Sequence, residues 1–259
     1  MKKIGVFDSG IGGLTVLESL VNHFPNEEYL YVADTLNCPY GTRSSEEIED
    51  LVLAIGLRII KQGVGVLILA CNTATSNSSK LVNASPIPII GVIKPTASFA
   101  YKKSINKKIL VLATNATVLS GQYENSLKEL GEGEFVFVQA SDFVPLVEKG
   151  LYSSDISYKI VCEKLNEYKS IDFDTIILGC THFNFLAEEI HSVFPKAKLI
   201  TCAEAIVEDL NKMLNRSKSS NKPKKILLTT TGDIRSFVKQ IDFLKIKYDC
   251  VCNFGEKKL

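Results

Sequence analysis

The sequence lacks tryptophan and carries only three histidines among its 259 residues. It also lacks any run close to the roughly 18 consecutive apolar residues that span a membrane. The N-terminal stretch "MKKIGVFDSG" has an apolar run too short for the core of a secretory signal. These absences predict a cytoplasmic protein that does not enter a membrane.

The sequence also has almost no excess of charge of either sign, because 30 basic residues are balanced by 29 acidic ones and the formal net charge is +1. The densest basic stretch, "RSKSSNKPKK" at 216–225, is rich in serine and asparagine, as solvated loops are. We therefore expect no nucleic-acid partner. Apolar residues make up 46% of the chain, a share typical of a globular protein with a substantial core.

Paired cysteine motifs are absent as well. The seven cysteines are an odd number and form no Cys-x-x-Cys, which argues against a disulfide framework, a zinc ribbon or a thioredoxin-type redox site. Cys180 and His182 would supply only two ligands to a metal ion, and Cys250 with Cys252 are more typical of strand packing. We predict no metal site.

What the sequence does contain is an alternation of short Val-, Ile- and Leu-rich runs with helix-period stretches, the pattern of α/β proteins with parallel sheets. Apolar residues at spacings of three and four predict a helix over 46–61, begun by Ser44 and Ser45. Two lysines precede three of the strands, and this repetition favours two similar α/β halves, although such lysines are also common by chance. The two halves are predicted to join near 95–108. Strands are predicted at 4–7, 29–33, 66–70, 89–91, 109–113, 135–139, 175–178, 198–200 and 226–230.

The motif "FDSGIGGLTVL" follows the first strand and opens a helix. Gly10, Gly12 and Gly13 would allow a tight turn with backbone N–H groups exposed at a helix N-terminus, which is an anion site. A dinucleotide fingerprint would need glycine at Val16, and a phosphate loop would need a Gly-Lys-Ser/Thr ending. A purely structural turn remains the alternative, but the carboxylate of Asp8 at a strand end favours a ligand site.

The next strand ends in "ADTLNCPYGTR". Pro39 restricts one backbone dihedral and Gly41 frees another, so Tyr40 is predicted on a short bend at the same edge of the sheet. On its own this pattern is also that of an ordinary turn.

Two cysteines occupy matching corners. Cys71 follows the apolar run of "VLILACNTAT", and Cys180 follows that of "TIILGCTHF". Both thiols are expected at helix N-termini, where the helix dipole lowers a cysteine pKa and favours the thiolate. His182 shares the second corner and can exchange a proton with a thiol. A single cysteine is more often a small buried hydrophobe, which is our interpretation of Cys162 and Cys202.

Two matched acid/base groups suit the inversion of a stereocentre. This reaction needs one group to remove a proton from one face of a carbon and another to return a proton to the opposite face. Two similar domains facing across a cleft would carry one thiol on each wall. A cysteine protease that paired Cys180 with His182 would leave Cys71 without a purpose.

Taken together, the motifs resemble the cofactor-independent glutamate racemases of the aspartate/glutamate racemase family. The resemblance runs nearly end to end, through "FDSGIGGLTVL", "ADTLNCPYG", "ACNTAT", "LATNATV", "LVEKG", "LGCTHF" and "TTGD". It implies that Cys71 and Cys180 are the catalytic acid/base pair, that Asp8 and His182 assist them, and that no cofactor is needed. The implied substrate-binding residues are Asp8, Ser9, Tyr40, Gly41, Asn72, Thr73, Thr114, Thr117, Glu148, Thr181 and His182.

The resemblance also implies an organisation. A first α/β domain would comprise residues 1–95 with 207–259, and a second would comprise 96–206, with mainly parallel sheets facing across a central cleft. The substrate would be glutamate, the product D-glutamate would supply peptidoglycan synthesis, and the assembly would be a homodimer. The chain departs from the family at Lys94, where an acidic residue is frequent, and at Phe183 and Asn184, where tyrosine and proline are frequent. These departures bear on the outer rim of the pocket and on partner contacts.

Other functions stay open at this point. An aspartate racemase would use the same two-cysteine logic, although the intact "PYG" beside "CNTAT" and "GCTHF" favours glutamate. A non-catalytic amino-acid-binding protein would also use two lobes around a cleft, and only the paired thiols argue against it. A pyridoxal-phosphate racemase needs a lysine at a strand end, where the motifs offer only Lys94, and it would leave both thiols unexplained.

Overall fold

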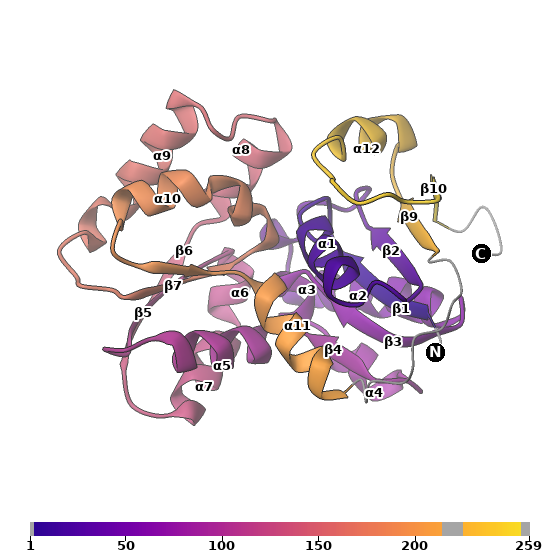
Figure 1. Cartoon of the computed structure of the whole chain (residues 1–259), viewed down its shortest axis with the longest axis horizontal. Helices are drawn as coiled ribbons and strands as arrows, with labels where there is room; N and C mark the ends of the chain where they lie inside the picture. Colours follow the sequence, from indigo (N-terminus) through magenta and orange to yellow (C-terminus); the bar gives the residue numbers. More distant parts are fainter. Residues whose placement is uncertain (1–2, 214–224, 255–259) are drawn as a thin grey trace.

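The structure, a computed structural model, describes residues 3–213 and 225–254. Its strands form two parallel sheets that lie side by side (Figure 1). The first sheet has the order β10-β9-β2-β1-β3-β4, with bounds Cys250–Asn253, Ile226–Thr230, Tyr29–Ala33, Lys3–Asp8, Val64–Leu69 and Ile89–Gly91. The second has the order β6-β5-β7-β8, with bounds Glu134–Gln139, Lys108–Ala113, Thr175–Gly179 and Lys198–Ile200. The predicted α/β fold class is confirmed, and every predicted strand is present.

Helices cover both faces of the sheets, which explains why the central strands read as nearly continuous apolar runs. Strands β2, β7 and β9 are buried along their whole length. The α-helices are α1 (Leu14–His23), α2 (Ser45–Ile60), α3 (Asn72–Ser76), α4 (Ser79–Ala84), α5 (Ile93–Lys103), α6 (Asn115–Leu119), α7 (Gln122–Leu130), α8 (Val144–Glu148), α9 (Asp155–Leu165), α10 (Ala187–Val193), α11 (Cys202–Met213) and α12 (Ile234–Gln240). Short 3₁₀ helices are η1 (Tyr40–Thr42), η2 (Ser141–Phe143), η3 (Asn166–Tyr168) and η4 (Thr181–Leu186).

The start of α2 follows directly from local sequence. The Ser44 side chain accepts a hydrogen bond from the Glu47 N–H, and the Glu47 carboxylate accepts one from the Ser44 N–H. This capping box satisfies backbone donors that a helix N-terminus leaves unpaired. The observed helix therefore begins one residue before the predicted range of 46–61.

The segment at 95–108 was predicted to contain the boundary between the two halves. Most of it belongs to α5, which packs against α7 and β7 of the second sheet. Pro95 lies in the first turn of α5, where its missing N–H costs no intrahelical hydrogen bond. The link between the two halves is thus a helix rather than a loop.

The chain returns to the first sheet after β8. Helix α11 lies between the two sheets in Figure 1 and packs against α1 and α5. Its buried side chains Ile206 and Leu210 join the apolar core that contains Leu14 and Leu17 of α1. Strand β9 then pairs with β2, and β10 pairs with β9. The first sheet is therefore built from segments near both ends of the chain.

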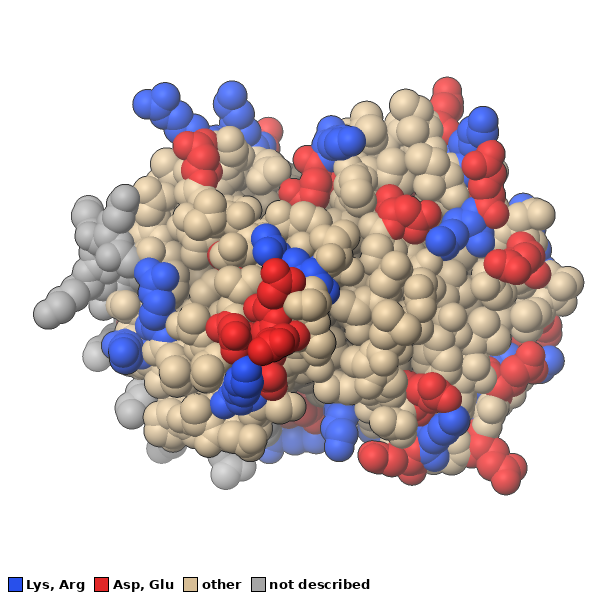
Figure 2. All heavy atoms as spheres, turned by 180° about the vertical axis from the view of Figure 1, so that it is seen from behind, with Lys and Arg blue, Asp and Glu red and all other residues tan. Residues whose placement is uncertain are grey.

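The surface carries interspersed charges. On the face opposite to that of Figure 1, the largest gathering of acidic side chains has basic ones beside it, and no broad area carries a single sign (Figure 2). Within residues 3–213 and 225–254, no helix has the length and apolarity needed to cross a membrane. Residues 216–224 of the basic stretch lie outside the described residues.

Candidate functional site

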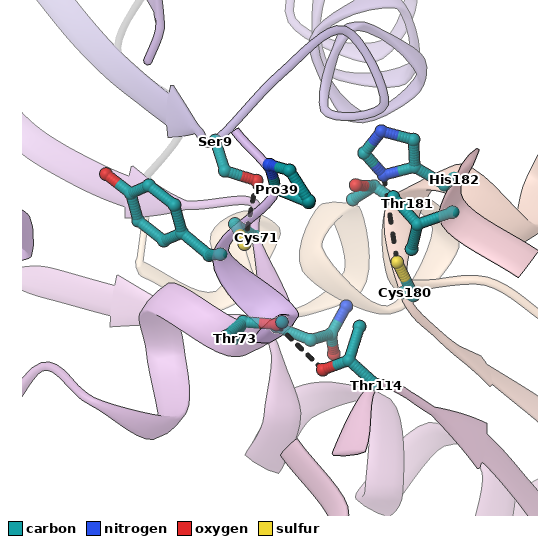
Figure 3. Close-up of a pocket in the computed structure, with 12 residues that line it drawn as sticks. Ser9, Pro39, Cys71, Thr73, Thr114, Cys180, Thr181 and His182 are labelled. Atoms are coloured by element: carbon teal, nitrogen blue, oxygen red, sulfur yellow. Dashed lines mark hydrogen bonds between the residues drawn. The ribbon is translucent and has the colours of Figure 1, made fainter. Parts of the chain in front are cut away.

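The carboxyl ends of four strands meet at one pocket between the two sheets. Strands β1 and β3 of the first sheet and β5 and β7 of the second end there, as expected for ligand sites of parallel sheets. The two thiols of Cys71 and Cys180 lie on opposite sides of this space, one from each sheet (Figure 3). The pocket is lined by Ser9, Pro39, Tyr40, Gly41, Cys71, Asn72, Thr73, Thr114, Val144, Cys180, Thr181 and His182.

Cys71 forms the N-cap of α3, as its position after a strand predicted. Its sulfur accepts a hydrogen bond from the Ala74 N–H at 3.4 Å and lies 3.5 Å from Ser9 Oγ. Burial nevertheless raises the pKa of Cys71 to about 12, and the nearby charge of Asp8 adds to the increase. The predicted lowering of this pKa was therefore wrong, since removal from water outweighs the two hydrogen bonds at this site.

Cys180 precedes η4 and has a different neighbour. Its sulfur lies 3.7 Å from Nδ1 of His182, and the other ring nitrogen of His182, Nε2, lies 2.5 Å from Oε1 of Glu148. Burial lowers the pKa of His182, but its hydrogen bonds to Cys180, Cys38 and Glu148 outweigh burial and hold the pKa well above 6.5. Burial raises the pKa of Glu148, but its contacts with His182 and Cys38 bring it below its usual value. The pair is therefore an imidazolium and a carboxylate at neutral pH.

The glycine turn after β1 does bind an anion, but the anion belongs to the chain. Asp8 Oδ1 accepts a hydrogen bond from the Gly10 N–H at 2.9 Å, and the Gly13 N–H also stabilises this carboxylate. A Cβ at Gly13 would lie 2.5 Å from Cβ of Asp8, so only glycine allows this close approach. Burial raises the pKa of Asp8, while the positive charge of His182 opposes that increase.

Tyr40 lies on the predicted bend, although for a different reason than its flanking residues suggested. Its hydroxyl donates to Asp34 Oδ2 at 2.6 Å, and its ring packs edge-on against Phe7. Gly41 does not have a positive φ, so its predicted backbone freedom is not used. A Cβ at Gly41 would instead lie 2.9 Å from Cβ of Thr114, which means that glycine lets the two halves approach each other.

Polar side chains from both halves converge beside the thiols. Asn72 is buried, its Oδ1 accepts a hydrogen bond from Tyr123 Oη at 2.7 Å, and its Nδ2 has no partner among the described residues. The hydroxyls of Thr73 and Thr114 lie 2.9 Å apart (Figure 3), and Thr117 Oγ1 lies 2.9 Å from Thr114. An unpaired buried donor is costly unless a ligand accepts from it. The pocket therefore offers an amide and hydroxyls to a polar ligand.

Comparison with known proteins identifies the family. The family model for Asp/Glu/Hydantoin racemase matches residues 4–210. The chain belongs to this racemase family. The predicted enzyme class, a racemase, is thereby confirmed.

Individual relatives of the racemase agree over most of its length. The glutamate racemase of Lysinibacillus sphaericus strain C3-41 is 39% identical over 214 residues, or 82% of this chain and 81% of that protein. The crystal structure of glutamate racemase isoform RacE1 from Bacillus anthracis has a TM-score of 0.89 and 33% identity, covering 96% of this chain and 95% of that one. The glutamate racemase of Francisella tularensis in complex with D-glutamate has a TM-score of 0.86 and 29% identity, covering 96% of each chain.

The racemase pocket is nearly closed. Its free volume is about 10 Å³, which is roughly the space that one water molecule requires. An amino acid does not fit into that volume. A substrate therefore needs more space than the lining side chains leave in this structure.

The pocket wall of the racemase does not include every predicted site residue. Asp8 lies behind Thr181, whose hydroxyl donates to its Oδ2 at 3.2 Å. Thr117 lies behind Thr114, and Glu148 lies behind His182. These residues reach the pocket through the side chains in front of them.

The sequence did not single out Cys38 and Asp34, although both lie next to site residues. Cys38 Sγ lies 3.7 Å from Oε1 of Glu148, and Asp34 holds Tyr40. A cysteine within "NCPYG" has no distinctive spacing to another ligand. Folding brings the turn that carries Cys38 against Glu148 of α8, 110 positions away along the chain, and the sequence alone does not indicate this contact.

The three departures from the family pattern lie outside the wall of the thiol-containing pocket. Phe183 is buried in the core of the second half, with its ring edge-on to Phe143, and does not form the outer rim. Asn184 Nδ2 donates to Thr15 Oγ1 at 2.9 Å, which joins η4 to α1. Lys94 has a side chain that is 79% exposed. None of these side chains lines the pocket.

Proposed function

We propose that the protein is a glutamate racemase that interconverts L- and D-glutamate by proton transfer between two cysteines. The observation that carries the proposal is the position of Cys71 and Cys180 on opposite sides of one pocket, each at the carboxyl end of a strand from a different sheet. An α-carbon between them could lose its proton to the sulfur on one side, and the resulting planar carbanion could gain a proton from the sulfur on the other side. The identity of about two fifths with the L. sphaericus glutamate racemase supports glutamate as the substrate.

The two thiols begin a turnover in different protonation states. Because the pKa of Cys71 is raised to about 12, we assign it the thiol, and we assign the thiolate to Cys180 beside the His182 imidazolium. Cys180 removes the α-proton of the enantiomer whose Cα–H bond faces it, and Cys71 delivers its proton to the opposite face. One C–H bond breaks and one forms, which leaves Cys180 as the thiol and Cys71 as the thiolate. The reverse reaction starts from that state.

We propose that Asp8 and His182 assist the two thiols. The negative charge of Asp8 favours the protonated form of Cys71, and His182 contacts the sulfur of Cys180 directly. Glu148 acts through His182 as a positioning residue, since its carboxylate holds Nε2 and leaves Nδ1 facing the sulfur. General acid/base groups of this kind typically contribute about 10²–10⁴-fold to a rate.

Substrate recognition would use donors from both halves. The unpaired Nδ2 of Asn72 is suited to a carboxylate oxygen, and the hydroxyls of Thr73 and Thr114 are suited to the second carboxylate. We propose that the remaining contacts come from the other predicted substrate-binding residues on the pocket wall, namely Ser9, Tyr40, Gly41, Thr181 and His182. Glutamate between these groups would link the two halves.

The wider role follows from the same proposal. We divide the racemase into a first domain of residues 1–95 with 207–259 and a second of 96–206, so that each domain contributes one thiol. Opening and closing between the domains would admit the substrate into the nearly closed pocket. We further propose a cytoplasmic homodimer that supplies D-glutamate for peptidoglycan synthesis.

The test is to incubate the purified protein with each glutamate enantiomer, without added cofactor, and to follow circular dichroism of the amino acid. Racemisation from both sides to the same end point is expected. L- and D-aspartate, treated identically, serve as the substrate control. Faster turnover of aspartate would replace glutamate by aspartate in the proposal. Tight binding of glutamate without any racemisation would indicate an amino-acid-binding protein instead.

A further inference from the structure

Three metal-ligating side chains meet beside the pocket, on the side of His182 that faces away from Cys180. The sulfur of Cys38, a carboxylate oxygen of Glu148 and a ring nitrogen of His182 all lie within 4.8 Å of one another. Cys38 comes from the loop after β2, Glu148 from the end of α8, and His182 from η4. The cluster therefore joins the first sheet's half of the molecule to the second.

The donor types and distances suit zinc. Thiolate, imidazole and carboxylate are the ligands that Zn²⁺ takes in proteins, and three protein ligands with one open position describe many accessible zinc sites. Two ligands of a tetrahedral zinc ion lie roughly 3.4–3.6 Å apart, given bonds of about 2.0–2.3 Å. Cys38 Sγ is already 3.7 Å from Glu148 Oε1, whereas His182 Nε2 is 2.5 Å from that oxygen and would have to move away by roughly 1 Å.

Two further features leave room for an ion. A Cβ at Gly10 would lie 3.2 Å from Cys38 Sγ and 3.3 Å from Glu148 Oε1, so the glycine keeps one side of the cluster open. A hollow of about 390 Å³ opens beside Cys38 and Glu148 and extends to Thr35 and Gln240. In the described part of the chain, this hollow and the thiol pocket share only Pro39 among their lining residues. Water and ions can thus approach the cluster without passing between the two thiols.

We propose that Cys38, Glu148 and His182 form an inhibitory binding site for Zn²⁺. Zn²⁺ would replace the proton on Cys38 Sγ and the proton on His182 Nε2, and both protons would be released to solvent. His182 would then be bound to the ion rather than free to respond to Cys180. The ion would also tie the two halves together across the nearly closed pocket, which would block the movement that admits glutamate. The inhibition rests on the proposed racemase function, whereas the binding does not.

The binding experiment uses Co²⁺ as a visible substitute for Zn²⁺. Protein stripped with a chelator and kept reduced is titrated with Co²⁺, and the thiolate-to-metal charge-transfer absorption is recorded; Zn²⁺ is then added to displace the Co²⁺. We expect one equivalent of Co²⁺ to bind, and we expect Cys38→Ser and Glu148→Gln each to weaken binding at least roughly tenfold, the lower limit for loss of a supporting group at a metal site. Cys162→Ser is the matched control, because this half-buried thiol lies in α9, outside the cluster.

Two results would overturn the site. One is wild-type protein without the charge-transfer absorption. The other is an absorption that survives Cys38→Ser but disappears in Cys180→Ser, which would place the ion on the catalytic thiols. Near-ultraviolet circular dichroism of each variant checks that it is folded before its result is used.

The inhibition experiment measures racemisation against free Zn²⁺, with each variant compared with its own rate in chelator. We expect Zn²⁺ to inhibit the wild type, a chelator to restore the rate, and Cys38→Ser to need at least roughly tenfold more Zn²⁺ for the same inhibition. Equal sensitivity of wild type and Cys38→Ser would overturn the inhibitory role. If the protein does not racemise glutamate at all, the Co²⁺ titration still decides the site, so the two proposals fail separately.

Discussion

The two cysteine corners are alike in sequence and different in chemistry. Both follow a buried strand and precede a short helix, and both sulfurs face the same pocket. Cys71 has backbone and hydroxyl donors around it, with the carboxylate of Asp8 nearby. Cys180 has the ring of His182, which Glu148 supports from behind. The two sulfurs therefore face the same pocket from chemically different surroundings.

This difference shows that the position after a strand places a thiol but does not set its proton affinity. The Cys71 sulfur caps the short helix α3, yet burial and the Asp8 charge dominate its pKa. The groups that distinguish the corners come from β1, α8 and η4. The comparison leads to predictions that either remove one corner or make the two corners more alike.

Loss of either thiol should have the largest effect. Cys71→Ala and Cys180→Ala, and equally the serine variants, should lower racemisation about 10²–10⁴-fold in both directions, because each direction needs one base and one acid. A hydroxyl is not ionised near neutral pH, so serine keeps the shape and loses the base. The measurement is circular dichroism of glutamate from each enantiomer. Near-full racemisation by Cys180→Ser would mean that His182 carries the second proton.

The same variants should separate the two corners in heavy water. The intact racemase should introduce deuterium at the α-carbon of the product, since the returned proton comes from a thiol that exchanges with solvent. Each single mutant should show slow α-exchange of one enantiomer only, with opposite preferences in the two mutants. Proton NMR of the α-position reports this exchange. The same preference in both mutants would contradict the assignment of one face to each thiol.

Removal of the carboxylate behind His182 should bring the second corner closer to the first. In Glu148→Gln the pKa of His182 should fall towards 6.5, and kcat should fall roughly tenfold or more, because the imidazolium beside Cys180 is less populated. NMR titration of the His182 ring gives the pKa directly. A lowered kcat with an unchanged His182 titration would show that Glu148 acts in another way.

The same pair should also contribute to stability within a defined pH window. The raised pKa of His182 stabilises the fold fully below pH 6.5, and this contribution is lost as pH rises through the folded value. The lowered pKa of Glu148 stabilises the fold above pH 4.5, and this contribution is lost as pH falls through its folded value. Between these limits Glu148→Gln should reduce the free energy of unfolding by roughly 1.5–3 kcal/mol, as measured by urea denaturation.

The pH dependence of kcat/KM should reflect the asymmetry of the corners. The proposed two-cysteine mechanism needs one thiolate and one thiol, so a bell-shaped profile is expected. Because burial raises the pKa of Cys71 to about 12, the alkaline limb should lie above the ordinary thiol value of 9.0. Stopped assays from about pH 6 to 11 cover both sides of a free thiol. An alkaline limb below 9.0 would contradict the assignment of Cys71 as the thiol.

A smaller effect is expected at Tyr123, whose hydroxyl orients Asn72, the proposed hydrogen-bond donor to the substrate. Tyr123→Phe removes the hydrogen bond to Asn72 Oδ1 but leaves the ring buried. A hydrogen bond of this kind contributes about 1 kcal/mol, so KM should rise roughly fivefold while kcat changes less. Steady-state kinetics with both enantiomers separates the two constants. A fall in kcat alone would place Tyr123 in the chemical step instead.

The smallest effect is expected at Lys94, far from both corners. Its exposed side chain lies 3.9 Å from Glu129, a contact that adds little in water. Lys94→Glu should leave kcat and KM unchanged and should shift the free energy of unfolding by less than about 0.5 kcal/mol. A large change in kcat would show that this departure from the family pattern affects catalysis.

The strands and the two corners could be predicted from sequence because their signals are local. An apolar run such as Val66–Leu69 indicates a strand, and the small polar residues after Cys71 indicate the start of a helix. The outer limits of α5 were harder, since Pro95 and the following polar residues are typical of a loop but are also compatible with a first helical turn. Gly41 was predicted to serve only the turn. The residues that flank a glycine in the sequence do not reveal which residue of the other half lies against it.

The sequence alone determined the α/β class, the positions of the predicted strands along the chain and the two thiols at strand ends, because periodicity and turn residues act over a few positions along the chain. Only the tertiary structure decided that Cys38, Glu148 and His182 meet, that Asp8 occupies its own glycine turn, and that burial raises the pKa of Cys71. Proton affinity depends on burial and on charges a few ångströms away. Those neighbours are brought together by folding from positions up to 173 residues apart, as in the contact between Asp8 and Thr181.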